Sequence, residues 1–279
     1  MKTLIESSLI QFIDRLPTSK LKEAALYAVK AGGKRFRPLV VLSLIESYGW
    51  DYLPFVDLAT SIEMIHLYSL IHDDLPAMDD DVLRHGVPTI HKQFDEATAI
   101  LLGDGLLTNA FERVIESRSI QDHQKVKLVQ LLATRAGLNG MVYGQFLDIE
   151  AEGKQANVEH LTLISRHKTG KLIEAAFRMG ALIAAPQDEE RWGQIGLHLG
   201  LMFQIQDDVL EITATEAELQ KSKSDVALNK ATFVSQLGLQ KAKAMIVSLY
   251  QEVQKELSFL KIKKPTITEL INKIYARRY

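Results

Sequence analysis

The sequence predicts one all-α domain of about ten or more helices, extending over residues 1–279. Only 7 prolines and 16 glycines occur in 279 residues, which leaves room for long helices and disfavours a turn-rich β fold. Apolar residues recur at the spacing of amphipathic helices, whereas no segment shows the sustained alternation of a half-buried strand. No linker-like stretch and no internal repeat divides the chain.

The first helices can be placed from their apolar residues. One stripe near the N-terminus consists of Leu21, Ala24, Ala25, Ala28 and Val29. A later helix is predicted to begin with Asp57 as its N-cap and to continue to Asp73. Pro76 should end or kink that helix, because proline lacks an amide donor and clashes with the preceding turn.

Composition and charge exclude several classes of protein. Hydrophobic residues make up 47% and charged residues 24%, and the net charge of −2 disfavours nucleic-acid binding through a broad basic face. The absence of cysteine excludes disulfides, thiolate metal sites and a cysteine nucleophile, and it agrees with a reducing cytoplasm. The N-terminus does not resemble a leader, and no apolar run reaches about 18 residues, so we expect a cytoplasmic protein without a membrane span.

Residues 73–81 are unusually acidic and contain Asp73, Asp74, Asp79, Asp80 and Asp81. An acidic run by itself is usually a solvated turn. This run follows the apolar stretch 67–71, whose helix we expect to be buried, and buried carboxylates are costly unless a cation compensates them. Because Pro76 breaks the helix inside the run, the acids on either side of it can converge.

A second acidic cluster follows a helical segment in which Gly193, Gly196 and Gly200 share one face and allow a neighbouring helix to approach closely. The cluster consists of four polar residues at helical i+3 and i+4 spacing: Gln204, Asp207, Asp208 and Glu211. Like charges so placed repel each other unless cations bind them. Oxygen ligands of this kind suit Mg²⁺, and two clusters together predict two or three magnesium ions and a polyanionic ligand.

Basic residues are placed to meet such a ligand. The segment Gly32-Gly33-Lys34-Arg35-Phe36-Arg37-Pro38 is a compact cationic turn in which glycine permits close backbone approach. Arg84 follows the first acidic cluster. Further basic residues flank positions 169–170 or follow the second cluster: Arg166, Lys168, Lys171, Lys221, Lys223 and Lys230. His66 shares a helical face with Asp73 seven residues later, so we expect it beside the metal or a diphosphate.

Five motifs occur in one order: the cationic turn at 32–38, Asp73-Asp74-x4-Asp79, Arg84, His-Lys-Thr-Gly at 167–170 and Phe-Gln-x-Gln-Asp-Asp at 203–208. The set resembles the trans-isoprenyl diphosphate synthases, specifically the bacterial farnesyl diphosphate synthases. The resemblance implies a homodimeric helical bundle with a central active-site cavity. It also implies a head-to-tail condensation of isopentenyl diphosphate with the allylic diphosphates dimethylallyl and geranyl diphosphate, which gives farnesyl diphosphate.

The resemblance also implies a role for each site residue. Magnesium on the allylic diphosphate would be bound from one wall by Asp73, Asp74 and Asp79 and from the other by Asp207, Asp208 and Glu211. The same diphosphate would also be held by Arg84, Lys168 and Lys230, with Lys221 as a helper. Isopentenyl diphosphate would be held by Lys34, Arg37, His66 and His85. Thr169 and Gln204 would present oxygen dipoles to the allylic cation, and Tyr68 would limit the product to fifteen carbons.

The sequence departs from the family pattern at three places. Glu211 stands where aspartate is usual, which keeps the charge but moves it by one methylene group. His85 stands where a second arginine is usual, and neutral histidine lacks the bidentate fork of arginine. The segment 220–225 lacks the glycines of the usual flexible loop.

Several alternatives stay open at this point. A longer-chain, geranylgeranyl-type synthase is one alternative, although such relatives tend to have small residues where Tyr68 stands. A weakly active or non-catalytic subunit is another, which predicts loss of metal ligands or diphosphate cations, whereas here only peripheral positions differ from the family pattern. A class I terpene cyclase shares an acidic motif, but the cationic turn at 32–38 would have no purpose there. A metal phosphohydrolase using His72 and Asp73 would leave the second acidic cluster unexplained.

Overall fold

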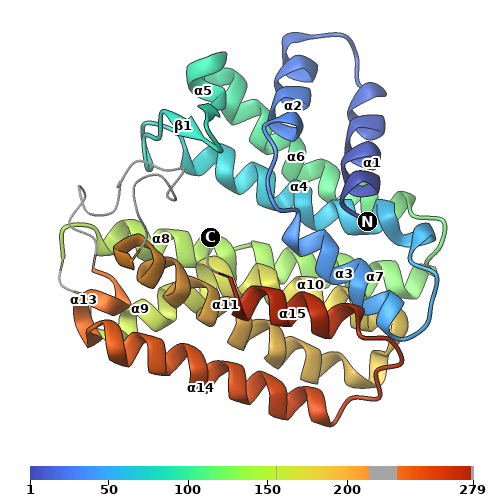
Figure 1. The fold of residues 1–279 in the computed structure, drawn as a ribbon. Coiled ribbons are helices and arrows are strands. Elements are labelled where there is room, and N and C mark those ends of the chain that lie inside the picture. The colour runs from blue at the N-terminus through green and yellow to red at the C-terminus, as the bar shows by residue number, and fades with distance from the viewer. Residues whose placement is uncertain (155, 214–230, 278–279) are drawn as a thin grey trace. The chain divides into compact units, whose positions relative to one another are not determined.

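The computed structural model describes residues 1–154, 156–213 and 231–277, and helices dominate it (Figure 1). The all-α class predicted from the sequence is confirmed. Within the described part of the chain, the strands are two residues long: β1 (Leu83–Arg84) pairs antiparallel with β2 (Val87–Pro88). No helix of these ranges is both long enough and apolar enough to cross a membrane.

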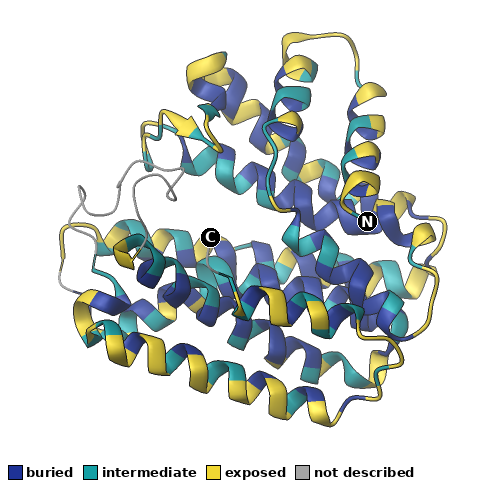
Figure 2. Ribbon diagram, viewed as in Figure 1, coloured by how far each residue is buried: buried dark blue, intermediate teal, exposed yellow. Residues whose placement is uncertain are grey.

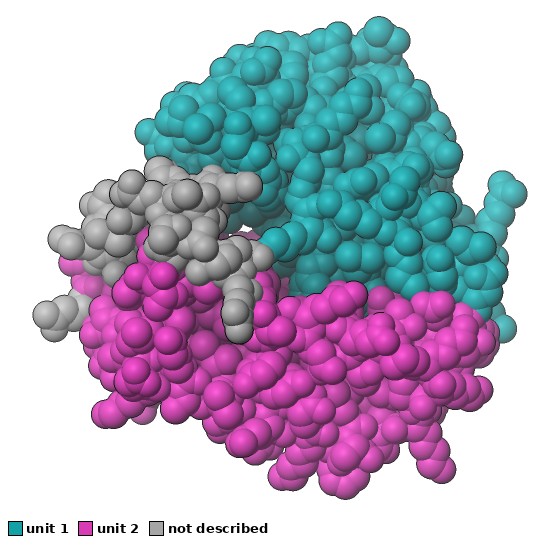
Figure 3. All heavy atoms as spheres, in the orientation of Figure 1, with its two compact units in different colours: residues 1–42, 51–129 teal, residues 43–50, 130–279 magenta. Residues whose placement is uncertain are grey.

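The chain groups into two compact units, coloured separately in Figure 3. Unit 1 is formed by Met1–Leu42 with Asp51–Val129, and unit 2 by Ser43–Trp50 with Gln130–Tyr279. Helices α3 (Phe36–Ser47) and α7 (Asp122–Ala136) each begin in unit 1 and end in unit 2. The single domain and the central cavity expected from the sequence stay predictions.

Unit 1 is built around α4 (Val56–Asp73), which is buried along most of its length (Figure 2). Helices α6 (Glu96–Glu116) and α1 (Lys2–Asp14) pack against it. The remaining elements of the unit are α2 (Lys20–Lys30), η1 (Leu53–Phe55) and α5 (Ile90–Gln93). Of the predicted stripe near the N-terminus, the alanines and Val29 are buried on α2, whereas Leu21 is exposed because it lies in the first turn.

The two ends of α4 were predicted with different success. The helix ends at Asp73, ahead of Pro76 as expected. The N-cap prediction was wrong, because Phe55 occupies that position. The 3₁₀ turn η1 ends at Phe55, and α4 begins directly after it at Val56. Asp57 instead lies in the first turn of α4, where its Oδ1 accepts hydrogen bonds from Ser8 Oγ at 2.7 Å and Arg113 Nη2 at 2.6 Å.

Unit 2 is centred on α10 (Lys171–Ala184) and α11 (Glu189–Thr213), which pack along each other. Its other elements are α8 (Met141–Ala151), α9 (Val158–Ser165), the π-helical turn η2 (Arg166–Gly170), η3 (Pro186–Asp188), α13 (Phe233–Leu237), α14 (Leu239–Ser258) and α15 (Thr266–Tyr275). Phe177 of α10 stacks on Trp192 of α11 with ring centroids 5.7 Å apart, and both are fully buried.

The glycines of α11 allow the close helix approach that their spacing predicts. A Cβ on Gly196 would lie 2.7 Å from Cα of Glu174, and a Cβ on Gly193 would lie 2.5 Å from Nε of Arg178. Both contacts are shorter than van der Waals packing of carbon atoms allows, about 3.5 Å. At Gly196 the backbones of α10 and α11 can therefore approach this closely only because the residue has no side chain, whereas at Gly193 the missing side chain makes room for the side chain of Arg178.

Candidate active site

The first acidic cluster lies where α4 ends and the chain turns back on itself. The backbone amide of Asp79 donates to the carbonyl of Asp73 at 2.9 Å, which returns the chain to the end of the helix. Asp74 is only 3% exposed, and burial raises the pKa of its carboxyl group to about 6 although Arg84 opposes the shift. The negative charges of Asp81 and Asp79 raise this pKa further, so the carboxylates of the cluster converge as expected.

Arg84 is held by two acids of this cluster. Its Nε donates to Oδ1 of Asp74 at 2.6 Å, and its Nη2 donates to Oδ2 of Asp81 at 2.9 Å. Asp80 instead lies 3.3 Å from the ammonium group of Lys92. Asp74 and Asp81 therefore orient Arg84 in this structure, and the role of Asp74 as a metal ligand stays a prediction.

The cationic residues of unit 1 gather around His66. Burial and then the positive charges of Arg37, Arg84, His85 and Arg35 lower the pKa of His66 well below 6.5. Burial also lowers the pKa of the Arg37 guanidinium to about 10. A cluster of cations with a neutral histidine among them is suited to bind an anion, since a negative ligand relieves their mutual repulsion.

The β1–β2 hairpin presents His85 to this cluster. Its two turn residues, His85 and Gly86, have φ angles of 52° and 80°, as a tight two-residue hairpin requires. Gly33 lies beside the hairpin, where a Cβ would be 3.5 Å from Cε1 of His85. The structure thus brings the turn that carries Lys34, whose side chain is exposed, next to His85 within unit 1.

Arg35 belongs to the same turn as Lys34 and Arg37 but forms a buried ion pair, which the sequence analysis did not predict. It is 2% exposed, and its Nη1 donates to Oε1 of the buried Glu63 at 2.9 Å while Nη2 donates to the carbonyl of Val29 at 2.5 Å. Its own φ of 49° belongs to the left-handed region. Arg35 therefore anchors the turn to α4, and the signal that could have revealed it is the single glutamate Glu63 in an otherwise apolar stretch.

The second acidic cluster lies on α11 in unit 2. Asp208 is buried and accepts hydrogen bonds through Oδ2 from the amide of Phe233 at 2.7 Å and through Oδ1 from Nε2 of Gln204 at 3.4 Å. Asp207 Oδ1 lies 2.7 Å from Nη2 of Arg277, a residue that sequence reasoning did not single out. Glu211 follows one turn later and is partly buried.

The motif at 167–170 forms the π-helical turn η2, and its side chains reach two different helices. Nζ of Lys168 donates to Oδ2 of Asp148 on α8 at 2.7 Å. Oγ1 of Thr169 donates to Oε1 of Gln204 on α11 at 3.4 Å, so two of the residues predicted to face the allylic cation lie together. Asp148 was missed, although its i+3 relation to Gln145 marks a polar face on the apolar helix α8.

Lys221 and Lys230, the remaining predicted diphosphate ligands, lie outside the described residues. Within residues 1–154, 156–213 and 231–277, no three histidine, aspartate or glutamate side chains are gathered closely enough to hold a metal ion by themselves. The carboxylates of each cluster would therefore need water or ligand oxygens to complete the shell of a magnesium ion, which is the usual way that proteins bind it.

The motifs and the fold agree with those of known proteins. A family model described as polyprenyl synthetase matches residues 18–266. The chain is 45% identical to a farnesyl diphosphate synthase of Geobacillus stearothermophilus, covering 92% of this chain and 88% of that protein. It is 40% identical to a farnesyl diphosphate synthase of Bacillus subtilis, with 99% and 95% covered.

A solved structure supports the same relationship. The crystal structure of a geranyltransferase from Helicobacter pylori, complexed with magnesium and isoprenyl diphosphate, matches this fold with a TM-score of 0.84 and 35% identity, covering 99% of this chain and 95% of that chain. The resemblance drawn from the five motifs is confirmed. The chain belongs to the polyprenyl synthetase family.

Proposed function

We propose that this protein condenses isopentenyl diphosphate head to tail with dimethylallyl and geranyl diphosphate and releases farnesyl diphosphate. The observation that carries the proposal is the arrangement in unit 1, where a converging acidic cluster and a cationic cluster meet at Arg84. The relatives named farnesyl diphosphate synthase bear out the predicted enzyme class, a trans-prenyltransferase.

The donor atoms of both acidic clusters fit magnesium. They are carboxylate oxygens throughout, which hard divalent cations prefer. Burial, with the neighbouring charges of Asp81 and Asp79, raises the pKa of Asp74, and a bound cation would favour its ionised form. The residues that would hold two or three ions are Asp73, Asp74, Asp79, Asp207, Asp208 and Glu211. Bound magnesium would neutralise the charge that develops on the departing pyrophosphate.

The cations divide between the two substrates. Lys34, Arg37, His66 and His85 would bind isopentenyl diphosphate, and Arg84 with Lys168, Lys221 and Lys230 would bind the allylic diphosphate. A neutral His66 donates one hydrogen bond without adding charge, which suits a site that already holds several guanidinium groups. Thr169 and Gln204 would direct oxygen dipoles to the allylic cation. The released pyrophosphate would accept the proton that the condensed product loses.

Product length would be limited by Tyr68, which is 7% exposed on α4 and contacts the ring of His72 edge to face. Burial and the charge of Asp73 raise the pKa of its hydroxyl group to about 12, so the phenol stays neutral beside the first acidic cluster. By the family resemblance, a bulky ring five residues before Asp73 favours a fifteen-carbon product over the longer geranylgeranyl chain.

We also propose that the protein is a homodimer and acts in the cytoplasm. Large apolar side chains are exposed on two helices: Ile100 and Leu101 on α6, and Val142, Tyr143 and Phe146 on α8. A second copy of the chain would cover such faces. Light scattering on a size-exclusion column should give the mass of two chains, and Phe146→Ser should shift the distribution toward one.

The test of function is incubation with isopentenyl diphosphate, geranyl diphosphate and Mg²⁺, followed by chain-length analysis of the product. We expect a fifteen-carbon diphosphate, and its formation should cease with EDTA. A twenty-carbon main product would identify a geranylgeranyl-type synthase instead. Failure to condense any allylic primer would overturn the catalytic proposal and favour a non-catalytic subunit.

A further inference from the structure

The π-helical turn η2 is held from two sides by glycine. A Cβ on Gly144 of α8 would lie 2.0 Å from the backbone nitrogen of Lys168 and 2.5 Å from the carbonyl carbon of His167. A Cβ on Gly200 of α11 would lie 2.5 Å from Cα of Gly170. In both places the neighbour is backbone, which cannot move aside as a flexible side chain can. Even one methyl group would displace the turn by roughly 1 Å, since carbon atoms pack at about 3.5 Å.

The same two helices also hold the side chains of the turn. Asp148 follows Gly144 by one helical turn on α8, and its carboxylate accepts from Lys168 Nζ at 2.7 Å. Gln204 follows Gly200 by one helical turn on α11, and its Oε1 accepts from Thr169 Oγ1 at 3.4 Å. Each helix therefore presents a glycine to the backbone of η2 and, four residues later, a polar group to a side chain of η2.

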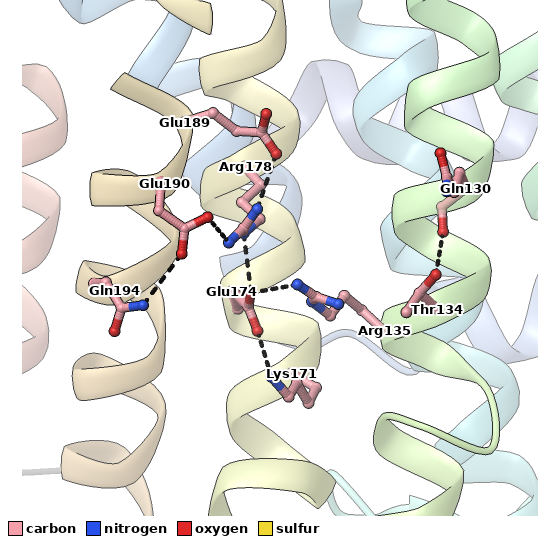
Figure 4. A network of polar contacts seen from close by, with 9 residues as sticks. All are labelled: Gln130, Thr134, Arg135, Lys171, Glu174, Arg178, Glu189, Glu190 and Gln194. Carbon is pink, nitrogen blue, oxygen red and sulfur yellow. Dashed lines mark hydrogen bonds and ion pairs between the residues drawn. The ribbon is translucent and has the colours of Figure 1, made fainter. Parts of the chain in front are cut away.

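The exit from the turn is fixed by buried charges, shown in Figure 4. Glu174 of α10 is 1% exposed, and its Oε2 lies 2.9 Å from Nζ of Lys171, the residue that follows η2. Its Oε1 lies 2.9 Å from Nη2 of Arg135 and 2.9 Å from Nε of Arg178. This network ties the start of α10 to α7, so displacement of η2 cannot be relieved by sliding α10 along its axis.

From these contacts we propose that Gly144 and Gly200 are positioning residues for the condensation. Their missing side chains set how far η2 enters between α8 and α11, and thereby where Lys168 and Thr169 reach. The inference rests on the proposed function, because Lys168 acts on the allylic diphosphate only if the protein is a prenyltransferase. π-Helical turns are rare, and they are found preferentially at functional sites.

The chain offers a matched control on the same helix. Gly196→Ala introduces a clash nearly as close as the one at Gly200, 2.7 Å from Cα of Glu174, but against α10 rather than against η2. We expect Gly196→Ala and Gly200→Ala to lower the melting temperature to a similar extent.

The kinetics should separate these variants. In Gly144→Ala and Gly200→Ala we expect kcat to fall at least about tenfold and KM for geranyl diphosphate to rise several-fold, with KM for isopentenyl diphosphate nearly unchanged. Gly196→Ala should keep both Michaelis constants and kcat within about threefold of the wild type. Equal kinetic loss in Gly196→Ala, or wild-type kinetics in Gly144→Ala and Gly200→Ala, would overturn the proposal.

If a glycine variant fails to fold, amide hydrogen exchange decides the question. In Asp148→Asn and Gln204→Ala the backbone contacts of both glycines remain, so the amides of residues 167–170 should exchange as slowly as in the wild type. Exchange of these amides as fast as in an unstructured loop would show that side-chain hydrogen bonds, not the glycines, hold the turn. Failure of the wild type to condense any primer would instead overturn the proposed function, while the exchange result would still test the placement of η2.

Discussion

The guanidinium group of Arg277 lies 2.7 Å from Oδ1 of Asp207, a predicted magnesium ligand, and stacks over the ring of Phe203 at 4.3 Å. The backbone leading to Arg277 is itself anchored, because Nε2 of Gln206 donates to the carbonyl of Tyr275 at 3.1 Å. A cation from the C-terminal segment thus lies against the second acidic cluster.

Removal of this cation should make magnesium bind more tightly. A partly exposed ion pair contributes about 0.2–1 kcal/mol, so Arg277→Gln should lower the half-saturating Mg²⁺ concentration by roughly 1.5- to 5-fold. Calorimetric titration of Mg²⁺ in the presence of inorganic pyrophosphate measures this directly. Arg191→Gln is the control, since Arg191 pairs with Glu256 instead. An unchanged or weaker affinity in Arg277→Gln would show that Arg277 does not compete with the metal.

Loss of the carboxylate of Asp148 should weaken catalysis without unfolding the protein. In Asp148→Asn the ammonium group of Lys168 loses the charged partner that fixes its position at 2.7 Å. Misplacement of such a group can cost up to roughly 100-fold in kcat/KM, here for geranyl diphosphate. Asp122→Asn removes a fully exposed aspartate that pairs with Lys125, and it should behave as the wild type in the same assay.

Replacement of Tyr68 by alanine should lengthen the product. The ring is buried on α4 five residues before Asp73, and its removal would open space where we propose that the growing chain extends. We expect twenty-carbon or longer products by chain-length analysis. Tyr52→Ala, which alters the segment ahead of η1, should leave the product unchanged. A fifteen-carbon product from Tyr68→Ala would exclude Tyr68 as the limit.

Arg35 and Arg37 should respond differently to substitution although they are two residues apart. Arg35→Gln leaves Glu63 as an uncompensated buried charge, which should lower the free energy of unfolding by about 3–5 kcal/mol. Urea denaturation measures this loss, and the double variant Arg35→Gln with Glu63→Gln should recover part of it. Arg37→Gln should mainly raise KM for isopentenyl diphosphate. Comparable stability of Arg35→Gln and wild type would contradict the anchoring role.

His66 should make stability depend on pH in a defined direction. Its pKa in the folded protein is lowered, so below about pH 6.5 the unfolded chain takes up a proton that the folded protein does not. The free energy of unfolding should therefore decrease as pH falls through 6.5 toward the folded pKa. His66→Gln should flatten this slope, as urea denaturation across that range will show.

Binding of an anion should shift the titration of His66 in the opposite direction. A diphosphate would offset the charges of Arg37 and Arg84 that now hold the pKa of His66 down. An NMR titration with isopentenyl diphosphate should therefore show a higher pKa for its imidazole than in the free protein. A pKa that does not move on binding would place the diphosphate away from this cluster.

Local rules were sufficient to predict several features of the chain. The end of α4 ahead of Pro76 follows from the covalent geometry of proline, and the close approach at Gly193 and Gly196 follows from helical spacing. The start of α4 was predicted wrongly because Asp57 satisfies the preference for an N-cap, while its actual partners, Ser8 and Arg113, are distant in the chain.

By itself, the sequence determined the all-α class, the five motifs and the chemical character of their side chains, because helical periodicity and residue type are local properties. Only the tertiary structure decided which charges act on a ligand and which act on each other. Arg35 anchors its turn by pairing with Glu63, Asp74 and Asp81 orient Arg84, and Asp207 pairs with Arg277. The pairs of Arg35 with Glu63 and of Asp207 with Arg277 join residues far apart in the chain, which no local pattern encodes, whereas Arg84 meets Asp74 and Asp81 through the turn that follows α4.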